Sequence, residues 1–109
     1  MSTVAGLELS VLLAVARLGD EAYGLAVRRD VGERMERDYS VGAIYTTLER
    51  LQEKGLINSR QAPPTPTRGG RSRRQFRLTA KGEKAIREAR DRVASQWTGI
   101  LQPLKAELG

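Results

Sequence analysis

Apolar residues recur at helical spacing over residues 7–18, and Gly19 follows them. We predict a helix there, with two apolar stripes instead of one. A short helix that is apolar nearly all round must be covered on more than one side. We therefore expect one side to pack in its own domain and the other to contact a second partner. The stripes are Leu7, Val11, Ala14 and Leu18, and Leu9, Leu12, Leu13 and Ala16.

A second helix is predicted over residues 22–37, after a turn at residues 19–21. Its apolar residues have a spacing of four, although Gly24 and Gly32 weaken the helix, because glycine is a poor helix former. On this pattern Tyr23 is a core residue. The expected buried stripe is Tyr23, Val27, Val31 and Met35.

A third helix is predicted over residues 41–54, because Ser40 is a good N-cap and Gly55 suits the position after the last turn. Its two faces differ in character, which indicates that one is buried and the other exposed. The face expected to be buried carries Ile44, Leu48 and Leu51, and the opposite face carries Gly42, Thr46, Glu49 and Glu53.

Two short strands are predicted next, over residues 56–61 and 75–78, the second from its alternation of polar and apolar residues. Residues 62–71 between them contain three prolines and a glycine pair, which excludes a helix and favours a loop. Two strands joined in this way form a β-hairpin, and its tip is rich in arginine.

The last predicted helix is capped by Thr79 and continues past Trp97, and Pro103 kinks or ends it. Its apolar residues recur in steps of three and four, which is typical of packing on another helix. We divide the chain into a domain over residues 1–79 and a dimerisation helix over residues 80–109 that packs on the same domain. The apolar seam is Ile86, Ala89, Val93, Trp97, Ile100 and Leu104.

The composition excludes most catalytic chemistry. The 109 residues include no cysteine and no histidine, which rules out disulfides, thiolate and imidazole ligands and nucleophile–histidine pairs. The thirteen acidic residues are scattered among arginine and lysine, so we expect no enzyme activity, no metal and no cofactor. Without a signal peptide or an apolar run that spans a bilayer, we expect a soluble cytoplasmic protein with no membrane contact.

The net charge of +6 is concentrated in residues 60–77, which hold six arginines and no acid, while the rest of the chain is balanced. Such a patch attracts a polyanion, and the arginine fork suits phosphate. A disordered basic linker is the alternative, and the two flanking strands count against it. The arginines are Arg60, Arg68, Arg71, Arg73, Arg74 and Arg77.

Three helices, a two-stranded hairpin and a long final helix give a mainly α protein with the element order of a winged helix-turn-helix. Small residues near its start allow the third helix to enter the major groove of DNA, and the N–H groups after Ser40 favour phosphates. The small residues are Gly42, Ala43, Thr46 and Thr47. Glu49 and Glu53 would repel DNA if this helix lay flat, so we expect it to dock N-terminus first. The hairpin arginines then contact the backbone or an adjacent minor groove.

Several motifs at consistent separations resemble the PadR family of transcriptional regulators, over about residues 7–90. They are Ala22-Tyr23-Gly24, residues 42–48 (GAIYTTL), residues 51–57 (LQEKGLI), Gly69-Gly70-Arg71 and residues 76–82 (FRLTAKG). The resemblance implies a bacterial transcriptional repressor that dimerises through its first and last helices. It also implies that the Tyr45 hydroxyl reaches a phosphate, and some family members release DNA on binding aromatic small molecules.

Two positions depart from the family pattern. Val41 stands where the family often has proline, but Ser40 still caps the helix, so we expect no change of role. The tryptophan that stacks on ligands in drug-binding members corresponds to Val93, and Trp97 lies one helical turn later. Trp97 is therefore either a dimer-core residue or a ligand-stacking residue.

The expected partners are double-stranded DNA with a palindromic operator, a second copy of the chain and an aromatic small-molecule effector. The expected DNA contacts are Ser40, Gly42, Ala43, Tyr45, Thr46, Arg50, Arg68, Arg71, Arg73 and Arg74. The expected dimer interface is Leu9, Leu12, Leu13, Ile86, Val93, Trp97, Ile100 and Leu104, and the ligand candidates are Val93 and Trp97.

Alternatives remain at two levels. The whole chain can be a winged helix that binds protein, or an RNA-binding module, although the purely basic hairpin and the few aromatic residues count against both. Arg28 and Arg29 either touch the DNA backbone or belong to a solvated face.

Overall fold

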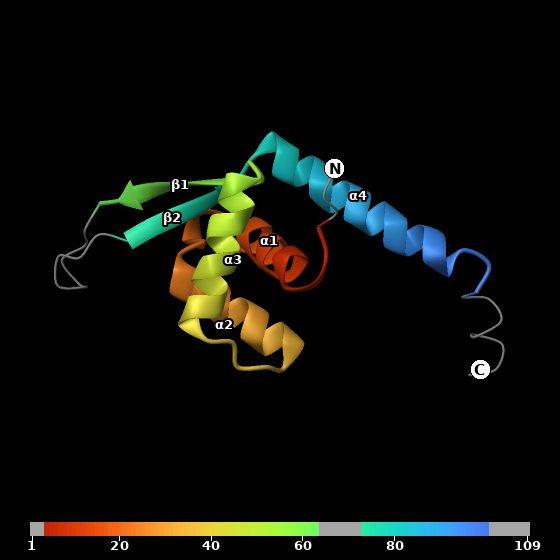
Figure 1. Cartoon of the computed structure of the whole chain (residues 1–109), viewed down its shortest axis with the longest axis horizontal. Coiled ribbons are helices and arrows are strands. Elements are labelled where there is room, and N and C mark those ends of the chain that lie inside the picture. The colour runs from red at the N-terminus through yellow and green to blue at the C-terminus, as the bar shows by residue number, and fades with distance from the viewer. Residues whose placement is uncertain (1–3, 64–72, 101–109) are drawn as a thin grey trace.

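The computed structural model describes residues 4–63 and 73–100. In these ranges the chain forms four α-helices, one 3-10 turn and one antiparallel hairpin, which confirms the mainly α winged-helix class. Figure 1 shows α1, α2 and α3 packed as one body, with the hairpin reaching out on one side and α4 on the other. The elements are α1 (Gly6–Leu18), η1 (Gly19–Glu21), α2 (Gly24–Met35), α3 (Val41–Glu53), β1 (Ile57–Ala62), β2 (Arg73–Leu78) and α4 (Ala80–Trp97).

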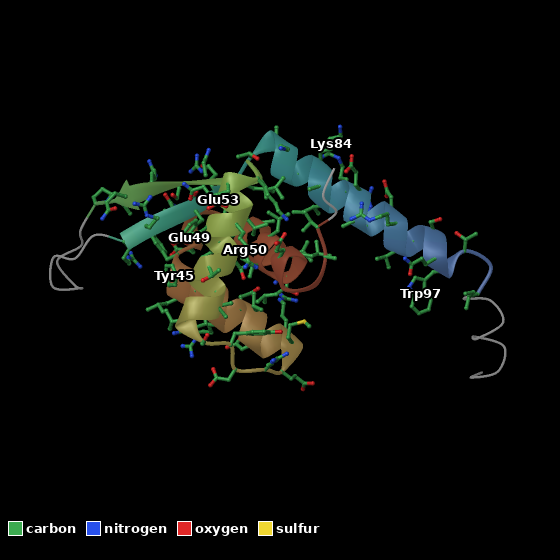
Figure 2. The ribbon with its side chains drawn as sticks, in the orientation of Figure 1. Tyr45, Glu49, Arg50, Glu53, Lys84 and Trp97 are labelled. Carbon is green, nitrogen blue, oxygen red and sulfur yellow. The ribbon has the colours of Figure 1, made fainter. Side chains whose placement is uncertain are left out.

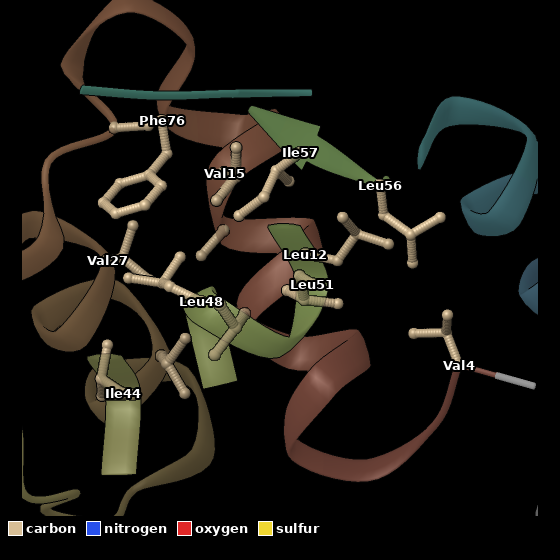
Figure 3. Packing of buried hydrophobic residues seen from close by; sticks show 14 residues of the cluster. Val4, Leu12, Val15, Val27, Ile44, Leu48, Leu51, Leu56, Ile57 and Phe76 are labelled. Atoms are coloured by element: carbon tan, nitrogen blue, oxygen red, sulfur yellow. The ribbon is translucent and has the colours of Figure 1, made fainter. Parts of the chain in front are cut away.

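The core lies among α1, α2, α3 and the hairpin (Figure 3). The predicted stripe of α3 is fully buried, and each such leucine or isoleucine contributes about 1.5–3 kcal/mol to stability. The buried face of α1 combines members of both predicted stripes, so its own chain covers more of α1 than the pattern predicts. The buried residues of α1 are Val11, Leu12, Ala14 and Val15.

The second helix is shorter than predicted at both ends. Ala22 and Tyr23 are extended along β2, because the Phe76 N–H donates to the Ala22 carbonyl (2.8 Å) and Tyr23 bridges to Gln75. At the other end Met35 is 53% exposed. Tyr23 and Met35 therefore do not belong to the buried stripe of α2. For Tyr23, the pairing with a distant strand overrides the helical pattern.

The hairpin begins earlier on its second strand than predicted. β1 and β2 pair from Ile57 opposite Leu78 to Ala62 opposite Arg73. Arg73 and Arg74 therefore lie on a strand, where the ladder fixes their directions, and not in the loop.

Thr79 is the single residue between β2 and α4, and three hydrogen bonds hold it. Its N–H donates to the Leu56 carbonyl (3.1 Å), its hydroxyl donates to the Gly55 carbonyl (2.7 Å), and its Oγ1 accepts from the Gly82 N–H (3.0 Å). Gly82 packs against the same carbonyl, since a Cβ there would lie 2.1 Å from the Leu56 oxygen. The first turn of α4 is thus fixed to the start of the hairpin.

The prediction that the last helix continues past Trp97 is wrong. Thr98 caps the helix, and Gly99 adopts the left-handed region with φ of 81°. Ile100 therefore follows the helix, and Pro103 and Leu104 lie outside the described residues. None of the helices in residues 4–63 and 73–100 has the length and hydropathy needed to cross a membrane.

Charged pairs connect α2 and the end of α3 to α1. Asp30 forms an ion pair with Arg17, and Arg34 adds a contact of 3.4 Å. Hydrogen bonding from Arg17 holds the pKa of the Asp30 carboxyl below its ordinary value. Lys54 Nζ lies 2.5 Å from Glu8 Oε1. These contacts fix the orientation of the three helices behind the exposed face of α3.

Candidate nucleic-acid interface

The exposed side of α3 combines small residues near its start with charged residues further along. Ser40 caps the helix as predicted, because its Oγ accepts a hydrogen bond from the Ala43 N–H (3.0 Å). Figure 2 labels the charged side chains of this side, Glu49, Arg50 and Glu53. The exposed residues include Gly42, Thr46, Glu49, Arg50 and Glu53.

Thr47 does not belong to this exposed side. It is buried, and its hydroxyl donates to the Ala43 carbonyl one turn earlier (2.7 Å). It lies three residues after Ile44 and shares the buried face with it. Thr47 therefore cannot face a groove of DNA, and Ala43 is half-buried beside it.

Tyr45 joins α3 to the first turn of α2. The residue is 37% exposed, and its ring lies so close to Gly24 that a Cβ there would be 2.1 Å from the phenol oxygen. Gly24 therefore permits a close approach of the two helices. The Tyr45 hydroxyl lies at the N-terminus of α2, in a depression that Arg29 and Arg73 also line.

Tyr23 supports an arginine of the hairpin. The Arg73 guanidinium carbon lies 3.8 Å from the centre of the Tyr23 ring, a cation–π contact. The prediction that Tyr23 is a core residue is wrong. It is half-buried, and one face of its ring contacts this cation. The stack holds Arg73 against the body of the domain.

Arg74 is linked to α3 by a chain of hydrogen bonds. Its Nη1 donates to Ser59 Oγ of β1 (2.9 Å), and Ser59 Oγ donates to Gln52 Oε1 of α3 (2.9 Å). Arg74 lines a groove of about 640 Å³ between β2 and α3. The residues that line the groove are Tyr45, Glu49, Gln52, Glu53, Arg74 and Phe76.

Two further arginines of the basic segment are engaged within the domain. Arg60 Nε donates to Gln75 Oε1 (2.8 Å), and the buried Gln75 in turn donates to the Asp20 carbonyl (2.6 Å). Arg77 forms a salt bridge of 3.4 Å with the Asp20 side chain. The expected DNA contacts Arg68 and Arg71 lie outside the described residues.

The two arginines considered on α2 have different environments. Arg28 Nε donates to the Tyr39 carbonyl (2.6 Å), and its Nη2 lies 3.2 Å from Asp38 Oδ1. Arg28 therefore holds the turn between α2 and α3. Arg29 is exposed beside the depression that Tyr45 lines.

The model of the PadR-like family of transcriptional regulators matches residues 12–88, which run from within α1 to within α4 and include both strands. The chain belongs to this family. The predicted resemblance is confirmed, and so is the expectation that the chain is not an enzyme, because the family consists of transcriptional regulators. No curated protein matches the chain significantly in sequence.

Solved structures of other proteins resemble this PadR-like chain. A PadR family transcription regulator from Clostridium difficile is 25% identical with a TM-score of 0.61, over 93% of this chain and 98% of that one. Another from Eggerthella lenta is 26% identical with a TM-score of 0.59, over 94% and 87%. RosR from H. salinarum, at 22% identity, has a TM-score of 0.68 over 94% and 86%, and it supports the fold alone.

The predicted dimer residues of this PadR-like chain fall into three environments. Leu12 is fully buried in the core of its own chain, so its assignment to a dimer interface is wrong. Leu9, Leu13 and Ile86 are half-buried. Val93, Trp97 and Ile100 are exposed at 50%, 47% and 47%. Figure 2 places Trp97 at the far end of α4, away from the domain body.

Sequence reasoning missed the contacts that position the hairpin arginines of this PadR-like regulator. The Tyr23–Arg73 stack and the Gln52–Ser59–Arg74 chain each join residues more than six positions apart, so no local pattern reveals them. Among the described residues no acidic cluster is suited to hold a metal ion.

Proposed function

We propose that the chain is a homodimeric, sequence-specific DNA-binding repressor that acts in the cytoplasm on a palindromic operator. The observation that carries this proposal is the groove in which Arg74 of the hairpin and the exposed side of α3 meet. A recognition helix and a basic wing on one side of a molecule can contact a major groove and its flanking phosphates together.

The features of α3 favour duplex DNA. Its first turns carry Gly42 and Thr46 on the exposed side, and small side chains let a helix approach base edges in a groove about 12 Å wide. The capped N-terminus carries a partial positive charge that favours nearby phosphates. Arg73 and the Tyr45 hydroxyl then lie where they can bind the backbone.

The dimer is proposed from α4. Val93 and Trp97 of α4 are exposed apolar residues that the described part of the chain does not cover. A second α4, related by a twofold axis, would cover these residues in both copies. We assign residues 1–79 to DNA binding and residues 80–109 to dimerisation. Two recognition helices related by this axis must match half-sites about 34 Å apart.

Mobility-shift titrations with duplex DNA, RNA and single strands test this function. Tight binding to duplexes selected from a random pool supports it. A preference for RNA or single strands, or binding to none of the three, would favour the RNA-binding or the protein-binding alternative. Repression is tested separately, with a reporter placed behind the selected operator.

Changing Arg74 to alanine is expected to weaken binding to all duplexes alike. The slope of log affinity against log salt should fall by about 0.9 for each lost phosphate contact. Arg87→Ala on α4, with the same loss of charge on an exposed residue, should leave the slope unchanged. Changing Thr46 should instead alter the preference among operators. If the Arg74→Ala variant keeps the wild-type slope of log affinity against log salt, Arg74 does not contact the DNA.

The aromatic effector is proposed from the exposed Trp97 on α4. Two indoles near a twofold axis can hold a flat aromatic molecule between them, and the ligand releases DNA if it prefers a spacing that the operator does not match. Titration with planar aromatic dyes is expected to quench Trp97, the single tryptophan, and to lower operator affinity. A panel of dyes that changes neither signal would make Trp97 purely a dimer-core residue.

A further inference from the structure

The C-terminal half of the exposed side of α3 holds two carboxylates. Gly42, Thr46, Glu49 and Glu53 follow one another at spacings of three and four, so they form one line along the helix. Glu49 is the first long side chain on this line after two small residues. It therefore projects further toward a docked partner than its N-terminal neighbours do.

Neither carboxylate is neutralised within residues 4–63 and 73–100, where Glu49 and Glu53 have no ion pair. Arg74 lines the same groove, but its Nη1 is held by Ser59 (2.9 Å). Ser59 in turn is held by Gln52 (2.9 Å), which keeps the arginine at the wall of the groove. The surface proposed to approach a polyanion thus carries two carboxylates that form no ion pair with the described residues.

A carboxylate in the major groove weakens binding unless it meets a hydrogen-bond donor. An ionised carboxylate only accepts hydrogen bonds, and the donors that bases offer there are the N4 amino group of cytosine and the N6 amino group of adenine. Adenine places its N7 acceptor beside N6, which repels the second carboxylate oxygen. Cytosine offers its amino group without a neighbouring acceptor of its own, so it is the better partner.

We propose that Glu49 is a specificity-determining residue that accepts a hydrogen bond from the N4 amino group of one cytosine in each half-site. The proposal rests on the function proposed above. Glu53, one turn further from the N-terminus that enters the groove, reads no base and repels phosphates on all sequences alike. The two glutamates therefore have different roles, one in the choice of sequence and the other in overall affinity.

Selection of bound duplexes from a random pool by the full chain, by Glu49→Gln and by Glu53→Gln tests the proposal. The wild-type chain should favour cytosine about tenfold at one position of each half-site, within the range of one good base contact. Glu49→Gln keeps the length of the side chain but replaces one acceptor oxygen with an amino donor, so the preference at that position should shift from cytosine to adenine and the other positions should stay unchanged. Glu53→Gln, the matched control, should keep every base preference and bind all duplexes more tightly.

The possible failures are distinguishable. A wild-type operator with an unchanged cytosine preference in Glu49→Gln would overturn this proposal and leave the proposed function standing. So would a wild-type operator without a preferred cytosine. A wild-type chain that selects no duplex would overturn both. Both variants should unfold at the same midpoint temperature as the wild-type chain. Equal midpoints verify that a lost preference reflects recognition and not misfolding.

Discussion

Replacing Trp97 with aspartate is expected to convert the proposed dimer into a monomer and to lower operator affinity at least about a hundredfold. Trp97 is 47% exposed on α4 and lies one turn after the exposed Val93. A large aromatic residue at the centre of an apolar interface contributes strongly to binding, and a buried unpaired charge opposes it. Two linked recognition helices bind two half-sites far more tightly than one helix binds one, so loss of the dimer removes this gain.

Sedimentation velocity at micromolar concentration and an operator titration measure the two effects on the same samples. Gln96→Asp is the matched control, because it introduces the same charge at the neighbouring exposed position of α4. The control should remain dimeric and keep its affinity within about twofold, as a surface change does. A dimeric Trp97→Asp variant, or a monomeric wild-type chain, would contradict the α4 dimer.

Replacing Gly82 with alanine is expected to destabilise the fold by about 2–4 kcal/mol. The added Cβ would lie 2.1 Å from the Leu56 oxygen and 2.8 Å from Leu78 Cδ1. The first of these is a backbone carbonyl that also accepts the Thr79 N–H (3.1 Å). It cannot move away without breaking the connection between the hairpin and α4.

Gly42→Ala is the control for this change, since Gly42 also lies in the first turn of a helix and a Cβ there meets nothing within 4 Å. Alanine is a better helix former, so this variant should be more stable by about 0.5–1 kcal/mol. Urea denaturation of both variants gives the comparison. Equal stability of the two would mean that α4 is not seated on Leu56.

The features predicted correctly from the sequence are those that depend on neighbouring residues. The caps by Ser40 and Thr79 need only a hydroxyl three residues before an N–H group, and both hydrogen bonds are 3.0 Å long. The buried stripe of α3 follows from helical periodicity alone. The order of the elements, and with it the fold class, could be predicted because each segment has a clear period or clear breakers.

The errors arise where distant segments meet. Tyr23 fits the helical stripe of α2, but pairing with β2 draws it into an extended segment under Arg73. Leu12 is one of nine apolar positions around α1, and periodicity cannot tell which of them are covered by the rest of the same chain. The end of α4 at Trp97 is set by Gly99, one weak breaker in a seam that otherwise continues.

Because Thr79 alone connects β2 to α4, the orientation of α4 depends on the contact of its first turn with Leu56. With 18 residues, the helix is about 27 Å long, so a tilt of about 10° at its base would move its far end by about 5 Å. Arg73 lies at the other end of β2 from this joint, opposite Ala62. Small rotations at this joint are therefore magnified at the tip of α4. The stiffness of this joint and the length of α4 together set how precisely two copies in the proposed dimer can space their recognition helices.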